Sequence, residues 1–149
     1  MKQTGEYFIE APKTDVWAAL NDPEILGSCI LGCDQVTRLD DTHFEIALKA
    51  KVGPVNAKMQ VQVLLTELNP PHSYTIEGGA KGGPAGFAKG SAEVALESTE
   101  SGTRLSYLVN ASVGGKLAQV GSRLIDGAAR KIADDFFSKF RAKVSDNPN

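Results

Sequence analysis

The chain has 149 residues, a net charge of −2 and a hydrophobic fraction of 42%. A nearly neutral chain of this length has no basic excess to indicate a nucleic-acid partner, and it is long enough to bury a core without disulfides. No run approaches the ~18 apolar residues of a membrane helix, and residues 1–14 lack the apolar core of a signal peptide. We therefore expect one cytoplasmic domain over residues 1–149, with residues 145–149 as a disordered tail.

The first part of the chain predicts one strand followed by two short helices. Residues 4–10 alternate in polarity as a strand does, and Pro12 suits the first turn of a helix. Asp22 and Pro23 then begin a second helix, with Asp22 as its cap, and this helix ends near residues 30–32.

The middle of the chain predicts five or six antiparallel strands. Short turns containing glycine or proline separate them, so neighbouring strands pair as hairpins with one face in water. Alternation of apolar and polar residues marks the segments 44–52, 55–65, 74–76, 88–97 and 104–113.

Residues 116–143 predict one long helix over the dry face of this sheet. At 1.5 Å per residue it would be roughly 42 Å long, enough to cross the whole sheet. The fold class is therefore α+β: a curved, seven-stranded antiparallel sheet wrapped around a long C-terminal helix. The helix face is marked by residues at steps of three or four, namely Leu117, Val120, Leu124, Ala128, Ile132, Phe136 and Phe140.

Small residues dominate both the dry face of the sheet and the helix opposite it. Two such surfaces can close on each other, or sheet curvature can hold them apart around an apolar cavity. We expect the cavity, because ligand pockets are concave and apolar. Ile25, Leu26 and Ile30 would form its lid. The residues expected to contact a ligand are Trp17, Ile25, Leu26, Ile30, Met59, Phe87, Tyr107, Leu124, Ala128 and Phe136.

Four charged residues recur along the long helix: Arg123, Asp126, Arg130 and Asp134. Most such runs form a solvated face with weak ion pairs. The alternative is that Arg123 or Asp126 turns toward the cavity and fixes a polar head group.

The glycine-rich segment 78–90 is not a phosphate loop. It lacks the Gly-Lys-Ser/Thr ending, and Pro84 removes an amide donor. We interpret the segment as a flexible hairpin at the cavity mouth. Phe87 in this hairpin either folds back onto the core or acts as a gate or a contact to a membrane or partner, and both readings stay open.

Neither the cysteines nor the histidines predict chemistry. The spacing of Cys29 and Cys33 fits neither a zinc knuckle nor a redox pair, so we interpret them as reduced, packed thiols. His43 and His72 lie in turns without partners at metal-ligand spacing, and Ser122 has no neighbouring histidine to activate it. We therefore expect no metal site and no catalytic residue.

Five stretches of the chain form a recognisable set: residues 21–24 (NDPE), 29–33 (CILGC), 52–55 (VGPV), 82–90 (GGPAGFAKG) and 114–127 (GGKLAQVGSRLIDG). Together they resemble the CoxG family of carbon monoxide dehydrogenase subunits, a branch of the START-like, or SRPBCC, helix-grip superfamily. The resemblance covers residues 6–143, and its last stretch is the most specific. It implies the order β-α-α-β6-α, in agreement with the patterns above.

The resemblance also implies an accessory, non-catalytic role. Its members work beside a molybdenum-containing carbon monoxide dehydrogenase or a related molybdenum hydroxylase and are associated with attaching that enzyme to the membrane. A lipophilic ligand such as a quinone would suit the cavity, with no covalently bound cofactor. Many relatives continue into a hydrophobic tail, whereas this chain ends at residue 149, so we expect any membrane contact to be peripheral.

Two other function classes stay open beside this carrier or adaptor. One is a small enzyme of the same superfold, such as a cyclase or hydratase acting on an apolar substrate. An enzyme needs a general acid or base among its walls, and the inward-facing positions offer Tyr107 as the obvious titratable group. The other is a protein-interaction module with a collapsed cavity. The shortage of polar wall residues favours the carrier.

Overall fold

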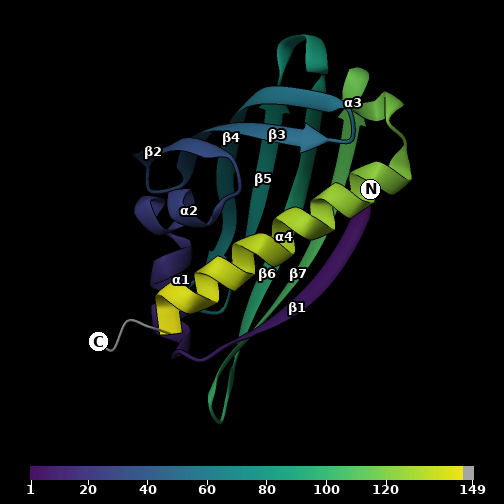
Figure 1. The fold of residues 1–149 in the computed structure, drawn as a ribbon. Helices are drawn as coiled ribbons and strands as arrows, with labels where there is room; N and C mark the ends of the chain where they lie inside the picture. Colours follow the sequence, from purple (N-terminus) through teal and green to yellow (C-terminus); the bar gives the residue numbers. More distant parts are fainter. Residues whose placement is uncertain (146–149) are drawn as a thin grey trace.

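The computed structural model describes residues 1–145. Its seven strands form one antiparallel sheet in the order β1-β7-β6-β5-β4-β3-β2, and a long helix crosses one face of this sheet (Figure 1). The predicted α+β helix-grip fold is confirmed. The elements are β1 (Lys2–Ile9), α1 (Lys13–Leu20), α2 (Pro23–Cys29), β2 (Cys33–Asp40), β3 (His43–Val52), β4 (Val55–Asn69), β5 (Ser73–Lys81), η1 (Gly83–Ala85), β6 (Phe87–Thr99), β7 (Gly102–Gly114), α3 (Lys116–Gln119) and α4 (Ser122–Ser145).

The two short helices begin as the sequence predicts. The Asp22 carboxylate accepts a hydrogen bond from the backbone N–H of Glu24 at 2.9 Å, which caps α2, and Pro23 occupies its first turn. The Thr103 hydroxyl, fully buried on β7, donates to the carbonyl of Ala11 at 2.7 Å. This bond ties the start of α1 to the sheet.

The long helix begins later than predicted. The chain forms a short helix, α3, breaks at Gly121 and starts α4 at Ser122. Gly121 has φ +96°, a conformation that helical residues do not adopt and that glycine tolerates best. At 24 residues, α4 is roughly 36 Å long. A disordered tail was predicted for residues 145–149. Ser145 is the last residue of α4, and residues 146–149 lie outside the described part of the chain.

The predicted helix face is wrong in its N-terminal half. Phe140 is fully buried, but Leu124 and Ile132 are 46% and 40% exposed. A step of four residues turns a helix by 400°, so a row of such steps drifts by about 40° each time. The row that faces the sheet at Phe140 has therefore rotated away from it by the positions of Ile132 and Leu124.

The buried residues form two clusters. The larger lies around the C-terminal half of α4 and joins both short helices to β1, β3–β7 and Phe140. The smaller lies at the other end of the sheet and contains Ala57, Met59, Ala85 and Leu117. The N-terminal half of α4 contributes no buried residue to either cluster.

Candidate functional site

Aromatic side chains close the space between the layers under the C-terminal half of α4. Phe137 stacks on Tyr7 of β1 with ring centroids 4.2 Å apart, and Phe136 stacks on Phe140 at 5.6 Å. On the opposite side, the Trp17 ring meets the Tyr74 ring edge to face at 5.2 Å. The two layers are in contact here, so this half offers no space for a ligand.

The two layers stand apart under the N-terminal half of α4. No residue from 122 to 139 is fully buried. Within residues 1–145, the backbone of α4 lies close to α1, α2, β1 and β3. It makes few or no close backbone contacts with the middle strands β4–β7. Inward-facing residues of those strands keep part of their surface exposed: Val61, Val63, Ile76, Ala92 and Val109. These strand residues are therefore incompletely covered by α4, and the cavity between the layers stays a prediction.

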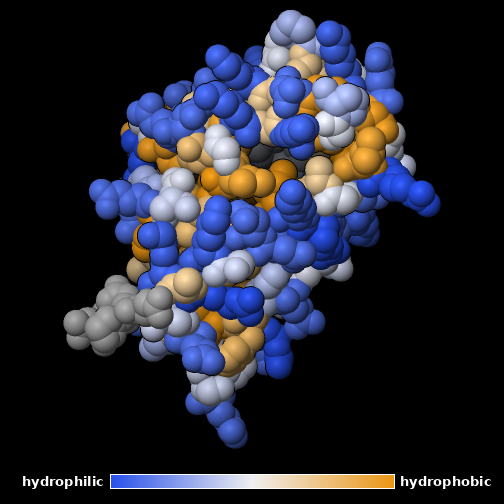
Figure 2. Space-filling view, viewed as in Figure 1, coloured by the Kyte–Doolittle hydropathy of each residue, from blue (hydrophilic) through white to orange (hydrophobic). Residues whose placement is uncertain are grey.

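This space opens to the outside. The space-filling view shows a hollow between α4 and the β3–β4 turn, and hydrophobic residues surround it (Figure 2). The Leu124 side chain reaches that turn, since a Cβ added at Gly53 would lie 3.1 Å from its Cδ1. We call this space the interlayer gap. An apolar surface that stays open to water is characteristic of a binding site.

Two side-chain contacts hold α4 against the β1 edge of the sheet. Arg130 donates from Nη1 to the carbonyl of Thr4 at 3.0 Å and to the Tyr107 hydroxyl at 3.4 Å. One turn later, the Asp134 carboxylate accepts a hydrogen bond from the Tyr7 hydroxyl at 2.6 Å. The Thr4 contact also satisfies a carbonyl on an edge strand, which has no neighbouring strand on that side.

Burial raises the pKa of the Tyr7 hydroxyl, and its hydrogen bond to Asp134 raises this pKa further. Burial likewise raises the pKa of Tyr74. A raised pKa favours the protonated form in the folded state, so the associated stability is complete below the ordinary tyrosine pKa of about 10 and is lost as the pH rises beyond it.

We therefore expect Tyr7→Phe to lower the free energy of unfolding at neutral pH by about 1 kcal/mol, because the hydrogen bond to Asp134 is lost. Above about pH 10 the wild type should lose stability more steeply than the variant, which has one fewer shifted tyrosine. Urea unfolding at a series of pH values measures both effects. If the stability of the two proteins falls in parallel with pH, Tyr7 is not the source of a raised tyrosine pKa.

The predicted ligand contacts are divided between the two halves. Trp17, Phe136 and Tyr107 belong to the closed, aromatic half. Met59 is 5% exposed and lies in the smaller cluster, so it is too covered to line an open gap. The remaining candidates are partly exposed, on or next to α2 and on the N-terminal half of α4: Ile25, Leu26, Ile30, Leu124 and Ala128.

Phe87 neither folds back onto the core nor gates the space between the layers, and its reading as a contact to a membrane or partner stays a prediction. It lies on the outer face of the sheet, away from α4, where its ring covers Gly114 of the neighbouring strand and stays 53% exposed. The segment that contains it is also less irregular than predicted, since β5 extends to Lys81 and β6 starts at Phe87. The alternation that places Ala88 inward places Phe87 outward.

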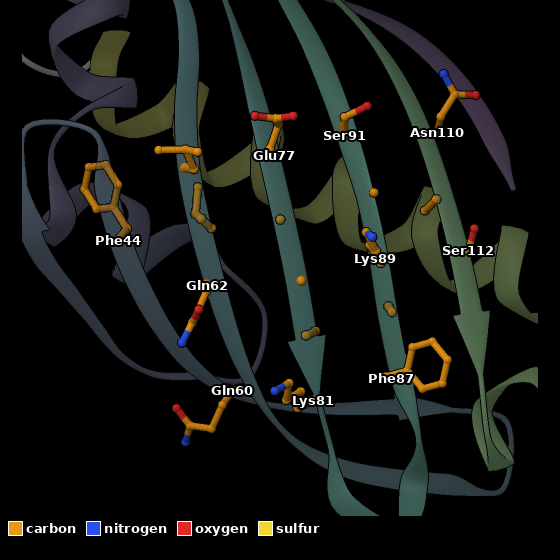
Figure 3. A pocket seen from close by; sticks show the side chains of 18 of the residues that line it. Phe44, Gln60, Gln62, Glu77, Lys81, Phe87, Lys89, Ser91, Asn110 and Ser112 are labelled. Atoms are coloured by element: carbon orange, nitrogen blue, oxygen red, sulfur yellow. The ribbon is translucent and has the colours of Figure 1, made fainter.

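The outer face of the sheet holds a broad groove of about 1340 Å³ that the sequence patterns did not predict. Side chains project from the sheet into this groove on the side away from α4 (Figure 3). Gly79 leaves open space at its floor. Its lining is mixed, with apolar surface from residues such as Leu39, Leu64 and Phe87 beside a set of polar side chains: Gln60, Gln62, Glu77, Lys81, Lys89, Ser91, Asn110 and Ser112.

Of the four charged helix residues, the structure brings the later pair to the sheet. Arg123 and Asp126, the predicted head-group candidates, are exposed. Arg130 and Asp134 make the contacts described above. Spacing alone could not distinguish the pairs, because the side of α4 that meets β1 depends on where the helix crosses the sheet.

The cysteines and histidines take the positions expected of structural residues. Cys29 is fully buried, and neither it nor Cys33 is in a disulfide. His43 contacts the Asp40 carboxylate at 2.8 Å, and His72 contacts the Lys13 ammonium at 2.8 Å. The backbone N–H of Thr42 and the His43 ring lower the pKa of Asp40 to about 2.

Comparison with known proteins decides the family. The sequence profile of CoxG, a subunit of carbon monoxide dehydrogenase, matches residues 5–145. The chain belongs to the CoxG family. No curated protein sequence matches this chain. Among residues 1–145, no helix is both long and apolar enough to span a bilayer.

Solved structures share this CoxG-family fold. A conserved protein from Geobacillus kaustophilus is similar with a TM-score of 0.91 and 28% identity, over 98% of this chain and 96% of that one. The Zhui aromatase/cyclase from Streptomyces sp. R1128 has a TM-score of 0.69 and 12% identity, over 97% and 93%. Ara h 8.0201 has a TM-score of 0.68 and 13% identity, over 99% of each chain. The last two likenesses concern the fold alone.

Proposed function

We propose that this protein is a non-catalytic accessory subunit that carries a lipophilic ligand in the interlayer gap. The partner would be a molybdenum-containing carbon monoxide dehydrogenase or a related molybdenum hydroxylase, as the family name and the sequence resemblance imply. The observation that carries the ligand proposal is the apolar surface on the sheet side of the gap, where the inward-facing Val61, Ile76 and Val109 keep part of their surface exposed. Covering that surface with an apolar molecule is favourable by about 25 cal/mol per Å².

A quinone, with an apolar tail and polar carbonyl groups, matches the chemical character of this gap. One end of the molecule would rest on the apolar walls of the gap, and the Arg130 guanidinium lies on the β1 side, where it contacts the Thr4 carbonyl and, at the border with the closed half, the Tyr107 hydroxyl. Guanidinium and hydroxyl groups can donate to a carbonyl oxygen. Bound there, a quinone would assist membrane association or electron transfer of the partner enzyme.

The second candidate is a small enzyme acting on an apolar substrate. Its support is the shared fold with an aromatase/cyclase. The candidate acid or base would be Tyr107, which is 9% exposed and contacts Arg130. Since one fold hosts many functions, this likeness supports the enzyme less than family membership supports the carrier.

Native mass spectrometry of the gently purified protein tests the carrier directly. We expect a bound lipophilic molecule, or stoichiometric uptake of a short-chain quinone added to the apo protein. The single tryptophan, Trp17, gives a parallel fluorescence titration. An apo mass that persists at saturating quinone would contradict the carrier, and release of a chemically altered quinone would favour the enzyme.

A further inference from the structure

The groove on the outer face of the sheet has two polar walls. Gln60 and Gln62 project from β4 on one side, and Asn110 and Ser112 project from β7 on the other (Figure 3). Strands β5 and β6 form the floor between them. Because neighbouring strands lie about 4.8 Å apart, the walls are about 14 Å apart, wide enough for one extended chain with its side chains. We call this groove the outer groove.

One glycine keeps the floor of the outer groove open. Gly79 lies there between Gln62 of β4 and Lys89 of β6. Within residues 1–145, nothing in the fold requires glycine at this position, since its φ lies outside the left-handed region and a Cβ added there would meet no atom within 4 Å. By contrast, a Cβ at Gly114 would collide with the Phe87 ring. A glycine inside a strand weakens the strand and often marks a place where a ligand or another backbone approaches closely.

The polar side chains of the outer groove are unpaired. Among residues 1–145, none of the following side chains forms a hydrogen bond or an ion pair: Gln60, Gln62, Glu77, Lys81, Lys89, Ser91, Asn110 and Ser112. An amide side chain both donates and accepts hydrogen bonds, as a peptide group does. Gln60 and Gln62 recur about every 7 Å along β4, which is also the two-residue repeat of an extended peptide. Successive peptide groups of a chain lying along β4 can therefore pair with them.

Two cations of the outer groove lie near each other without an acidic partner among residues 1–145. Lys81 on β5 and Lys89 on β6 are diagonal neighbours, since Lys81 pairs with Phe87. Like charges on neighbouring strands repel, and an anion between them relieves the repulsion. The charged lining carries +1 in a chain of net charge −2, from three lysines and two glutamates: Lys2, Lys81, Lys89, Glu45 and Glu77. The outer groove therefore favours a ligand with acidic groups.

Size and apolar contacts indicate what kind of ligand fits. The volume of about 1340 Å³ exceeds the ~300–1,000 Å³ of most small-molecule pockets, so a polypeptide segment suits the outer groove better than a small molecule. Phe87 is 53% exposed at one end of the groove, and Leu64 on β4 is half-buried. Both side chains can cover apolar side chains of a bound segment.

We propose that the outer groove binds an extended segment of a partner protein that contains acidic and apolar residues. Lys81 and Lys89 receive the carboxylates of this segment, and Gln60 and Gln62 bind its peptide groups. The open floor at Gly79 lets its backbone approach the sheet. The outer groove and the interlayer gap lie on opposite faces of the sheet, so this site is additional to the proposed carrier role and does not depend on it.

Selection from a phage-displayed library of random short peptides tests this site. The full wild-type chain is the target, and Gly79→Phe serves for counter-selection because its ring would cover the floor. Phenylalanine suits a strand and the added ring meets open space, so the variant should melt at the same temperature as wild type. We expect enriched peptides to contain Asp or Glu beside apolar residues. Synthetic copies should bind Gly79→Phe at least about tenfold more weakly in fluorescence anisotropy.

A matched control separates the position of the ring from its presence. Gly127→Phe adds the same ring at an exposed glycine of α4, where a Cβ also meets open space, and this variant should bind the peptides as wild type does. Three results would overturn the proposal: no enriched peptide, enriched peptides without acidic residues, or equal binding by Gly79→Phe and wild type.

Charge and location are separated by two double variants. K81Q/K89Q should bind the peptides about fivefold more weakly, whereas K131Q/K143Q removes the same charge from α4 and should bind as wild type does. Equal losses in the two would contradict the assignment of the lysines. Gly79→Phe should still take up a short-chain quinone, and loss of that uptake would show that the outer groove serves the carried ligand instead of a polypeptide. A wild type that binds the peptides but no quinone would contradict the carrier alone.

Discussion

Ala128→Trp is expected to abolish ligand uptake without unfolding the protein. Ala128 lies one turn after Leu124 and one turn before Ile132, on the part of α4 that borders the interlayer gap, and it is partly exposed. An indole at this position would occupy the gap that the ligand needs. Because the space is open, the added ring displaces water and not neighbouring side chains, so the overpacking cost of a filled core is avoided.

Quinone titration of the two proteins measures this effect, read by native mass spectrometry since the variant adds a second tryptophan. We expect affinity to fall about tenfold or more, as for a blocked pocket, with a melting temperature close to that of wild type. Lys131→Trp is the matched control, since Lys131 is exposed on the same helix. Unchanged uptake by Ala128→Trp would place the ligand elsewhere, and the groove on the outer face would be the next position to examine.

Phe140→Ala is expected to give the largest loss of stability. Phe140 is fully buried and lies against Phe136 and Phe137 at centroid distances of 5.6 and 6.2 Å. Truncating a buried phenylalanine costs about 3–5 kcal/mol, a large share of the ~5–15 kcal/mol that stabilises a domain. The melting temperature should fall by about 6–20 °C for a chain of this size.

Urea unfolding of Phe140→Ala and Phe87→Ala provides the comparison. Phe87 is 53% exposed on the outer face, so its removal should cost less than about 1 kcal/mol. If the two truncations cost the same, the assignment of Phe140 to a filled aromatic core would be wrong.

The sequence predicts the fold well because local patterns determine most of it. The period-two alternation of 55–65 and 104–113 indicates which side chains of each strand point inward and outward, and Asp22 and Pro23 mark the start of α2. The break at Gly121 is the main feature that the patterns did not predict. A lone glycine within a helical pattern is often tolerated, and only the tertiary path of the chain decides whether it ends a helix.

The site was predicted less well, and for two separate reasons. The sequence does indicate which half of the interlayer space is filled. Small residues are frequent on the helix before position 134, whereas Phe136, Phe137 and Phe140 follow it. The outward position of Phe87 likewise follows from the strand pattern of Ala88. By contrast, the contacts of Arg130 and Asp134 with β1 depend on how the helix lies across the sheet, which no local pattern contains.

Methyl NMR during titration with a short-chain quinone tests the central claim most directly. Methyl groups that face the interlayer gap, those of Val61, Ile76 and Ile125, should shift in proportion to the bound fraction, while Leu64 and Leu108 on the outer face should not. Shifts confined to the outer-face methyls, or no shifts at saturating quinone, would contradict a ligand held between α4 and the sheet.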